Sequence, residues 1–586
     1  MKSSEKLRTF HRTWYNSSIM KKYNNRVGNG KEDLLKLCTL SGTTEIGRNS
    51  NFIQYKDEII MIDAGYSFPG QEMYGIDYLI PNTKYLKKQK KNIKAILITH
   101  GHLDHIGALR WILPELDYPP IYAGGFAKSL IEAKMKEYKL EKKVKIFGVD
   151  RKSQIQIGKY FKATFVGINH SIPDAFSIFI QSPRGNIFFS GDFKFDLTPA
   201  NEPQSDYEKL KSLRGRVDLA LIESTNATVP GRAPSEKMIS ENLLEIISKQ
   251  KGRVIVSAFS SLITRLYSLI DIAKKTNRKV LLAGRSLDLA IKIARENGYI
   301  KVEDNLFIKD KDINKYPDNQ LLILCTGSQG ERFAVLNRIS LNEHRNIRIK
   351  RGDLVIMSSS EIPENISNIE RMTDRLISLG AELMKDTVNM KIHSTGHGNQ
   401  EDIRAMVEFI RPKYVMPIHG SLTFRYFNKQ NLEKWGINPN NILLTDDGQV
   451  WEYSNWQWKR GKNIESKPIL IDGLGVGDIG DMVLKDRKQL AEYGIFSVIL
   501  NLSANTHKIL GKPKFLSRGF IYFKNSQSLL KEITNTIFDE HRTWLSNEQN
   551  RAKPDYDKFK ESLEKSLAKL IYKKTEREPI IMVSMI

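Results

Sequence analysis

The hexapeptide His100-Gly101-His102-Leu103-Asp104-His105 places three imidazoles and one carboxylate within six consecutive residues. It directly follows the apolar run 96–99, so a strand that ends there delivers all four side chains into one loop. Imidazole and carboxylate groups are ligands for zinc and manganese, and two metal ions can share so dense a cluster. Seven of the 11 histidines lie in this motif or in three similar loops, which favours a metal site over a loop rich in histidine by chance.

Apolar runs that end in a polar residue recur through the first part of the chain. Layered α/β folds assemble their sites at the ends of strands, so these exits predict one common site. The residues at the exits are Asp63 after 59–62, His170 after 161–168, Asp192 after 186–189 and Glu223 after 217–222.

A second α/β region is predicted from about 231 to 389, where buried and mostly parallel strands alternate with helical patterns. Its strand exits are rich in Ser and Gly, at 259–261, 326–330 and 358–360. Backbone N–H groups and hydroxyls at such exits suit phosphate, although the same residue types are ordinary cap and turn residues. Histidines return at His393, His397 and His419. If His419 joins the first cluster, this region is an insertion in the first domain.

The composition is that of a basic, non-membrane protein with about three or four domains. A net charge of +24, from 91 Lys and Arg against 67 Asp and Glu, suits a polyanionic partner, although a lysine-rich proteome would give the same excess. No apolar run approaches the ~20 residues of a membrane span, and no secretory signal is visible. Cys38 and Cys325 lie in apolar contexts, as expected in a reducing cytosol. We therefore expect a cytoplasmic protein.

The spacing of the site residues predicts a pair of divalent metal ions. The proposed ligands come from four loops and are His100, His102, Asp104, His105, His170, Asp192 and His419. The two histidines that are two residues apart can bind one ion together with His170. Asp104 and His105 can bind a second ion together with His419, and Asp192 is the natural bridge. Such ions lie about 3.5–4 Å apart and lower the pKa of a shared water towards ~7.

These residues resemble the metallo-β-lactamase superfamily, and the inserted region resembles its β-CASP branch. Glu223 matches the acidic first β-CASP motif, His397 the second and His419 the third. Longer motifs narrow the resemblance to the ribonuclease J family from about Leu37 to the C-terminus. These motifs are Ala64–Pro69, Asn169–Asp174, Gly191–Asp196, Gly327–Glu331 and Asp472–Asp478.

The chain departs from the family pattern at three positions near the site. Leu103 stands where Glu is common, and since it is not a ligand we expect little loss. Glu223 stands where bacterial members usually carry Asp, and Thr395 replaces a Ser but keeps a hydroxyl.

The resemblance implies an α/β fold in which a metallo-β-lactamase αββα sandwich carries an inserted β-CASP α/β domain and a small C-terminal α+β domain. The expected segments are a flexible basic extension (1–36), the metallo-β-lactamase domain in two parts (37–230 and 390–465), the β-CASP domain (231–389), a glycine-rich linker (466–484) and the C-terminal domain (485–586). In the last, strands are expected at 495–500, 519–523 and 580–586, and helices at 526–545 and 556–573.

The implied activity is hydrolysis of RNA phosphodiesters, by 5′→3′ exonuclease action on 5′-monophosphate RNA and by endonucleolytic cleavage, in RNA maturation and mRNA decay. His397, oriented by Glu223, is expected to protonate the leaving 3′ oxygen. Asp63 is expected to orient a ligand histidine or the nucleophile. The expected phosphate-binding residues are Ser328, Gln329, Ser359, His393, Ser394, Thr395 and Gly396.

The expected cofactors are two divalent ions per chain, Zn²⁺ or Mn²⁺ or both. The expected partner is single-stranded RNA, with a homodimer or homotetramer formed through the C-terminal domain and docking to an RNA-decay complex or a paralogue. Two alternatives remain, a β-CASP nuclease that acts on DNA and a non-catalytic RNA-binding subunit. A small-molecule lactamase or thioesterase fits the basic charge and the insertion poorly.

Overall fold

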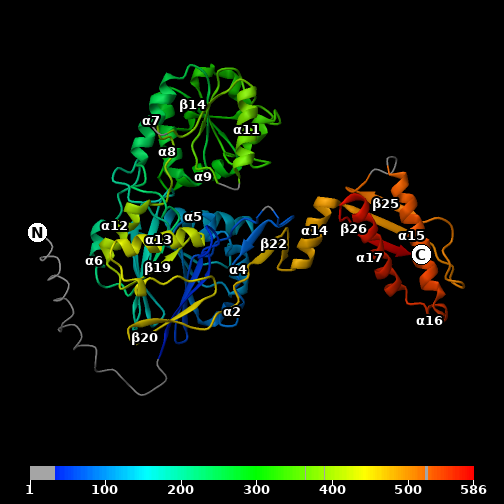
Figure 1. Cartoon of the computed structure of the whole chain (residues 1–586). Helices are drawn as coiled ribbons and strands as arrows, with labels where there is room; N and C mark the ends of the chain where they lie inside the picture. Colours follow the sequence, from blue (N-terminus) through cyan, green and yellow to red (C-terminus); the bar gives the residue numbers. More distant parts are fainter. Residues whose placement is uncertain (1–32, 71, 363–364, 388–389, 522–525) are drawn as a thin grey trace, which may run out of the picture. The chain divides into compact units, whose positions relative to one another are not determined.

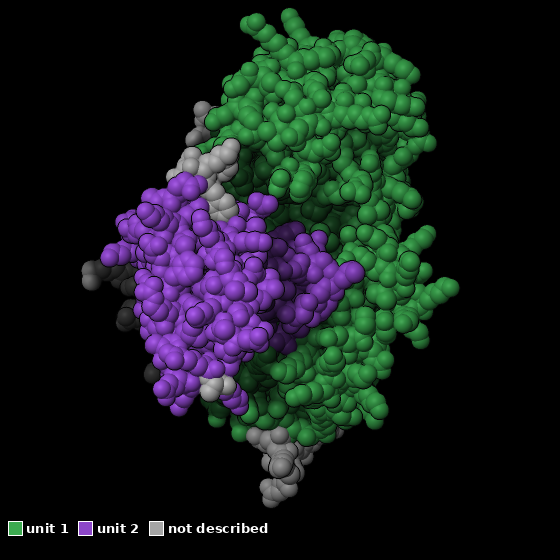
Figure 2. Space-filling view, turned by 90° about the vertical axis from the view of Figure 1, so that its right-hand side faces the viewer, with its two compact units in different colours: residues 1–65, 83–466 green, residues 66–82, 467–586 purple. Residues whose placement is uncertain are grey.

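The computed structural model describes residues 33–70, 72–362, 365–387, 390–521 and 526–586 (Figure 1). The predicted basic extension therefore lies outside the described residues, except at its end. At that end the structure differs from the expectation, because β1 (Leu35–Ser41) already includes Leu35 and Lys36. The chain forms two compact units, which Figure 2 colours separately. One comprises residues up to Gly65 together with Thr83–Ser466, and the other comprises Tyr66–Asn82 together with Lys467–Ile586.

The first unit contains a sandwich of two sheets. The larger sheet has the order β21 (Gln457–Arg460), β20 (Val450–Ser454), β1, β2 (Ser50–Tyr55), β3 (Glu58–Ile62), β5 (Ile93–Leu97), β6 (Ile121–Gly124) and β7 (Ile146–Val149). The smaller has the order β19 (Tyr414–Ile418), β12 (Leu219–Glu223), β11 (Asn186–Phe189), β10 (Ala175–Gln181), β9 (Phe161–Ile168) and β8 (Gln154–Ile157). Their inner faces share one core, to which Leu37, Ile53, Phe165, Ile178 and Leu221 belong.

Helices cover the outer faces of this sandwich. On the smaller sheet, α6 (Tyr207–Ser212) and α12 (Gln400–Ile410) pack their apolar sides against β9–β12, forming a second core. On the larger sheet, α5 (Gly125–Glu137) contacts β6 and β7. Shorter helices accompany it, namely α2 (Lys84–Lys87), α3 (Leu103–Ile106) and α4 (Leu109–Glu115). The αββα sandwich expected from the sequence is confirmed.

The inserted domain is a six-stranded sheet in which every pairing is parallel. Its order is β15 (Phe307–Ile308), β14 (Lys279–Ala283), β16 (Leu321–Cys325), β13 (Val254–Ser257), β17 (Leu354–Met357) and β18 (Glu382–Met384). One face packs against α7 (Glu236–Lys249), α8 (Ile263–Lys275) and α9 (Arg285–Glu296), and the other against α10 (Val335–Ser340) and α11 (Ile366–Ser378). Both faces are buried, as the nearly continuous apolar strands require.

The two strands that bracket the insertion are neighbours in space. β12 and β19 pair in parallel, with Glu223 opposite Ile418, although the whole β-CASP domain lies between them in sequence. Parallel strands align their carboxyl ends, so Glu223 and His419 leave the sheet at the same edge. Helix α13 (Leu422–Lys434) then begins just beyond His419.

The second unit combines a small α+β domain with a short sheet. The domain has the strand order β25 (Lys514–Arg518), β24 (Ile495–Leu500) and β26 (Ile580–Met585), with α15 (Gln527–Ser546), α16 (Glu548–Ala552) and α17 (Tyr556–Thr575). The strand expected at 519–523 is wrong, since β25 ends at Arg518; residues 522 and 523 lie outside the described chain.

The predicted glycine-rich linker is partly regular structure. β22 (Ile469–Asp472) pairs with β23 (Gly475–Val476) and with β4 (Tyr78–Ile80), and α14 (Asp481–Tyr493) follows. The sequence did not indicate that residues near 80 join this segment, because a strand of three residues carries no periodic pattern. Among the described helices, none combines the length and apolarity needed to cross a bilayer.

Candidate metal centre and catalytic site

Three histidines from two strand exits form the first ligand group. His100 and His102 follow β5, and His170 follows β9. The Nδ1 atom of His102 lies 3.1 Å from Nε2 of His100 and 3.0 Å from Nε2 of His170. Because these nitrogens converge, the three imidazoles could hold one metal ion, and their assignment as its ligands stays a prediction.

A second group of four ligands lies beside the first. It consists of Asp104, His105, Asp192 and His419, whose ligand atoms all lie within 4.8 Å of one another. Oδ2 of Asp192 is 3.2 Å from Nε2 of His105 and 3.7 Å from Nε2 of His419. The same oxygen is 3.7 Å from Nε2 of His100 in the first group. Asp192 therefore occupies the bridging position between the two groups.

Asp63 lies behind the His105 imidazole and is not part of either group of candidate ligands. Its Oδ2 lies 2.7 Å from Nδ1 of His105 and accepts a hydrogen bond from the Thr99 hydroxyl at 2.8 Å, while Oδ1 accepts from the Thr99 amide. Nε2 of His105 is thereby left facing Asp192 and Asp104. A carboxylate behind a ligand imidazole fixes the ring and its tautomer.

The other ligand histidines also have partners on their outer nitrogens. Nδ1 of His170 lies 2.7 Å from the carbonyl oxygen of Gly396, and Nδ1 of His419 lies 3.0 Å from the Thr225 hydroxyl. A Cβ at Gly396 would lie 2.6 Å from Cε1 of His170, so only glycine allows this approach.

Two residues of the site have left-handed backbone. Asp63 has φ 61° and His419 has φ 54°, directly after β3 and β19. Such conformations cost about 1–3 kcal/mol in non-glycine residues and are typical of functional sites.

Burial keeps the first group neutral. It lowers the pKa of His100 and His170 well below 6.5, and neighbouring imidazoles lower it further. For His102, burial outweighs the opposing charge of Asp104 and lowers the pKa to about 4. Neutral imidazole is the form that binds a metal.

The second group holds opposite charges. Burial opposes ionisation of Asp192, but His419 and His105 outweigh it and hold the pKa of this carboxyl well below 3.8. Burial likewise opposes the charged form of His105, yet Asp192 and Asp104 raise its pKa well above 6.5. A metal ion that binds His105 must displace its proton, so metal affinity should increase with pH.

The donor set and one unpaired atom fit divalent metal ions. Nε2 of His419 is buried and makes no hydrogen bond within the described chain, although Asp104 and Asp192 lie nearby. A buried nitrogen without a hydrogen bond is costly unless something else binds it. Imidazole and carboxylate ligands suit zinc and manganese, and this chain therefore binds divalent metal.

His397 forms an ion pair with Glu223 beside the ligands. Its Nδ1 lies 2.6 Å from Oε2 of Glu223 and 4.0 Å from Oδ2 of Asp192. Burial lowers the pKa of His397, but the charge and hydrogen bond of Glu223 outweigh this and raise the pKa to about 9. Oε1 of Glu223 accepts from the Phe193 amide at 2.6 Å, which fixes the carboxylate.

Two residues at the site were missed by the sequence analysis. The Asn49 amide Nδ2 lies 3.0 Å from Nε2 of His105 and 3.3 Å from Oδ2 of Asp104. A Cβ at Gly65 would lie 1.5 Å from the carbonyl oxygen of Asp104, so the ligand loop packs directly on this glycine. An Asn before a strand is an ordinary turn residue, and its contact is 55 positions away, so no local pattern reveals it.

Of the predicted phosphate-binding residues, Gln329 and His393 lie close together, because both contact Ser360. Gln329 donates to the Ser360 carbonyl at 2.8 Å, and the Ser360 hydroxyl lies 2.9 Å from Nε2 of His393, so these loops meet. Burial, and then the charge of Arg265, lowers the pKa of His393 to about 3, so its ring is neutral. Ser328 is buried.

The next three predicted residues support their neighbours. Ser394 contacts Lys194, Thr395 accepts from the His397 amide at 3.2 Å, and Gly396 accepts from His170. For Thr395 and Gly396, direct contact with RNA therefore stays a prediction, as it does for Ser359.

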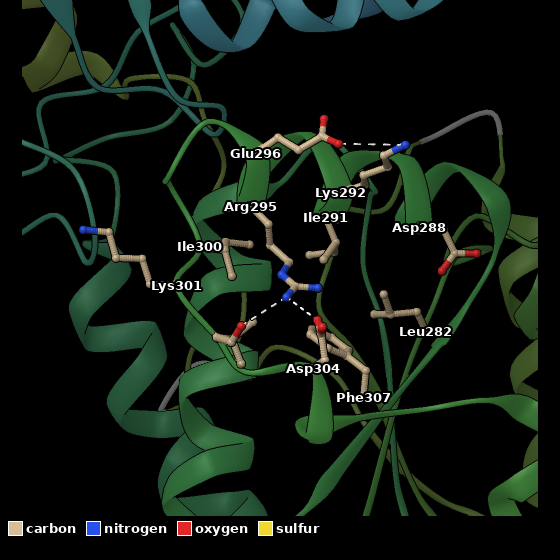
Figure 3. Close-up of a pocket in the computed structure, with 11 residues that line it drawn as sticks. Leu282, Asp288, Ile291, Lys292, Arg295, Glu296, Ile300, Lys301, Asp304 and Phe307 are labelled. Carbon is tan, nitrogen blue, oxygen red and sulfur yellow. Dashed lines mark hydrogen bonds and ion pairs between the residues drawn. The ribbon is translucent and has the colours of Figure 1, made fainter.

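A cavity of about 660 Å³ lies elsewhere on the β-CASP domain, beside α9 (Figure 3). Figure 3 shows the Arg295 guanidinium bonded to Asp304, and Lys292 paired with Glu296. None of the predicted site residues lines this cavity. This cavity is therefore separate from the His/Asp cluster.

Comparisons with known proteins agree with this geometry. Four family profiles match the chain: "Metallo-beta-lactamase superfamily" at 43–249, "Ribonuclease J, beta-CASP domain" at 251–376, "Zn-dependent metallo-hydrolase RNA specificity domain" at 385–428 and "Ribonuclease J C-terminal domain" at 482–586. "Ribonuclease J 1" of Streptococcus pyogenes is 37% identical over 94% of this chain and 97% of its own length. This chain belongs to the ribonuclease J family.

Other relatives extend the match over nearly the whole chain. "Ribonuclease J" of Mycoplasma pneumoniae is 36% identical over 93% of this chain and 96% of its own length. "Ribonuclease J2" of Bacillus subtilis is 33% identical over 94% and 98%. A crystal structure of a protein of unknown function from Enterococcus faecalis shares the fold, with a TM-score of 0.52 and 17% identity over 72% of this chain and all of that one. The protein is a metal-dependent ribonuclease.

Proposed function

We propose that this ribonuclease removes nucleotides from the 5′ end of single-stranded RNA that carries a 5′-monophosphate, and that it also cuts internally. The observation that carries the proposal is the convergence of seven ligands from four strand exits, with the His397–Glu223 pair 4.0 Å from the bridging carboxylate. A non-catalytic subunit would have no need to keep such a complete set. The assignment of individual ligands and of the acid is part of the proposal.

The proposed cofactors are two divalent ions per chain, Zn²⁺ or Mn²⁺ or both. When bound, they supply a water of lowered pKa and neutralise charge on the phosphate. His100, His102 and His170 would hold one ion, and Asp104, His105 and His419 the other, with Asp192 shared. Asp63 keeps the His105 ring in place through its 2.7 Å contact with Nδ1.

His397 is the proposed proton donor to the leaving 3′ oxygen. A pKa of about 9 keeps the imidazole protonated at neutral pH, as a general acid requires. Glu223 is buried and held by the Phe193 amide, so it fixes the orientation of the ring as well as its charge. General acid catalysis of this kind contributes about 10²–10⁴-fold.

The proposed 5′-phosphate pocket lies where the exits of β16 and β17 meet the segment that begins at Ile392. Gln329, Ser360 and His393 are linked there by hydrogen bonds. Since the pKa of His393 is about 3, the ring would contribute as a neutral group and not as a cation.

The C-terminal domain is the proposed site of dimer or tetramer formation. Leu516 and Met582 lie on either side of Ser497 in the register of β25, β24 and β26, and they are 59% and 47% exposed. Side chains in register on neighbouring strands share a face, so apolar groups are presented to solvent there. Docking to an RNA-decay complex or a paralogue, and a cytoplasmic location, stay predictions.

The decisive experiment compares 3′-labelled single-stranded RNA with a 5′-monophosphate or a 5′-triphosphate, in the presence of Mn²⁺ or Zn²⁺. The control protein carries Asp104→Ala together with His105→Ala. We expect progressive shortening from the 5′ end, faster with the monophosphate and absent in the control. Internal cuts alone would contradict the phosphate pocket, and equal cleavage by the control would contradict the metal site.

A further inference from the structure

Residues 392–397, here called the return segment, lead the chain from the β-CASP domain back to the metal centre. One end touches the catalytic groups, because Gly396 accepts from His170 at 2.7 Å and His397 pairs with Glu223 at 2.6 Å. The other end is hydrogen-bonded by side chains of the β-CASP domain.

Two β-CASP side chains grip the start of the return segment. The carbonyl oxygen of Ile392 accepts hydrogen bonds from Nη1 of Arg265 at 2.9 Å and from the Ser358 hydroxyl at 2.7 Å. Arg265 also donates to the Ser358 hydroxyl. Arg265 belongs to α8, and Ser358 directly follows β17.

A lysine from the metallo-β-lactamase domain holds the middle of the segment. Nζ of Lys194 donates to the Ser394 hydroxyl at 3.1 Å, and that hydroxyl donates to the Pro234 carbonyl at 2.6 Å. Lys194 lies two residues after the bridging Asp192, beyond the end of β11. The return segment is thus bound from both domains at once.

Glu236 joins these two cations. Arg265 donates to it through Nε and Nη2, each at 3.1 Å, and Lys194 lies 3.4 Å from Oε1. Arg265, Lys194 and Glu236 are 0%, 1% and 2% exposed. The Glu236 amide in turn donates to Asp196 at 2.8 Å, which gives two cations and two carboxylates in one buried network.

Such a network is a poor source of stability. Removing charges from water costs about as much as their attraction returns, and replacing all members of such a network together with apolar residues is often neutral or stabilising. Removing a single member is destabilising, because it leaves the partner charge buried and unpaired. Charged hydrogen bonds instead have a fixed direction. Nη1 of Arg265 donates to the Ile392 carbonyl oxygen in the return segment and to the Ser358 hydroxyl beside it. The contacts of the network therefore indicate a positioning role.

We propose that Lys194, Glu236 and Arg265 are positioning residues that hold the return segment so that Gly396 aims the His170 imidazole and His397 faces Asp192. Ser358 supports the same contact with Ile392, and the four residues are here called the brace. Because His393 also lies in the return segment, the brace positions both the phosphate pocket and the metal centre. The inference rests on the proposed function, because it takes the His/Asp cluster as the catalytic site.

The test replaces a brace residue and measures metal binding apart from activity. Arg265→Met removes the central cation of the network, and Ser358→Ala removes the hydroxyl that bonds Ile392 and Arg265 without removing a charge. The matched control is Arg253→Met. Arg253 is also buried, and its Nε donates to Asp353 at 2.8 Å. It lies at the amino end of β13, however, whereas Ser358 lies at the carboxyl end of the neighbouring parallel strand β17.

Binding of Co²⁺ to each full-length protein is measured from the absorbance of the bound ion. Turnover is measured separately with bis(p-nitrophenyl) phosphate, a small phosphodiester that has neither bases nor a 5′ end. We expect Arg265→Met and Ser358→Ala to weaken one of two Co²⁺ sites by about tenfold or more, the usual effect of losing ligand support, and to lower kcat. Arg253→Met should lower the Tm of the metal-free protein and leave Co²⁺ affinity unchanged.

Wild-type Co²⁺ affinity and kcat in both brace variants would overturn the proposal, as would an equal loss in Arg253→Met. If Arg265→Met does not fold, Ser358→Ala decides the question. Failure of the proposed function looks different, because wild-type protein would then bind Co²⁺ without cleaving RNA. Wild-type cleavage with unaffected brace variants would refute the positioning role alone.

Discussion

Replacing Glu223 with Gln removes one charge with almost no change in volume, and its effect should be confined to alkaline pH. The Gln side chain can still accept from the Phe193 amide, as Glu223 does at 2.6 Å. It cannot supply the charge that raises the pKa of His397 from 6.5 to about 9 against the effect of burial. In Glu223→Gln this pKa should fall to about 6.5, because Asp192 and Asp104 still oppose the effect of burial.

The acid must be protonated, so activity is lost as pH rises through the pKa of His397. At pH 8, about 0.9 of the molecules carry the proton with a pKa of about 9, but only about 0.03 with a pKa of 6.5. The rate at pH 8 should therefore fall by about thirtyfold or more. At pH 6 the corresponding fractions are about 1.0 and 0.8, so the rates should agree within about twofold.

The assay is single-turnover cleavage of labelled RNA between pH 5.5 and 9.5 with saturating metal. The charge of the bound metal ions affects the pKa of His397 in both proteins. The quantity to measure is therefore the difference between the pH values at which wild type and variant lose half of their activity on the alkaline side. Asp218→Asn is the matched control, because Asp218 accepts from the Asn186 amide at 2.8 Å just before β12, whereas Glu223 ends that strand. The reasoning would be refuted if wild type and Glu223→Gln lost activity at the same alkaline pH, or if the variant lost the same fraction of the rate at pH 6 as at pH 8.

Three further perturbations test other parts of the structure. Asp63→Asn should weaken metal binding by about 10–100-fold, measured by chelator competition, since the charge behind His105 is lost; unchanged affinity would deny Asp63 this role. Gly65→Ala should lower the free energy of unfolding in urea by about 1–3 kcal/mol, because its Cβ would lie 1.5 Å from the Asp104 carbonyl oxygen; full stability would show that the loop can move aside. Leu516→Glu with Met582→Glu should shift sedimentation from oligomer to monomer and leave cleavage of the small phosphodiester intact, since both side chains are half exposed; a persistent oligomer would exclude this face.

The sequence predicts those site residues that stand together in a short stretch of ligand-type residues directly after an apolar strand. His100 to His105 can be interpreted alone, because ligand residue types follow an apolar strand within one loop. His419 was harder to place, since its membership depends on β19 pairing with β12 across an inserted domain. The family resemblance supplied that link.

Contacts between distant single residues could not be predicted. Asn49 has no pattern that distinguishes it from a turn residue, and the Lys194–Glu236–Arg265 network joins three elements whose sequences look like ordinary helix and loop. The misplaced C-terminal strand has a related cause. β25 alternates exposed and half-buried residues around Lys514 and Arg518, so its apolar signal is weak.

The insertion between β12 and β19 also determines when the protein can become active during its synthesis. About 300 residues separate His105 from His419, and the ribosome needs roughly 15–60 s to add them at ~5–20 residues per second. Until then the growing chain lacks both the proposed proton donor, His397, and the proposed last ligand of the second ion, His419. We therefore expect the nascent chain to lack ribonuclease activity until about seven tenths of it has been synthesised.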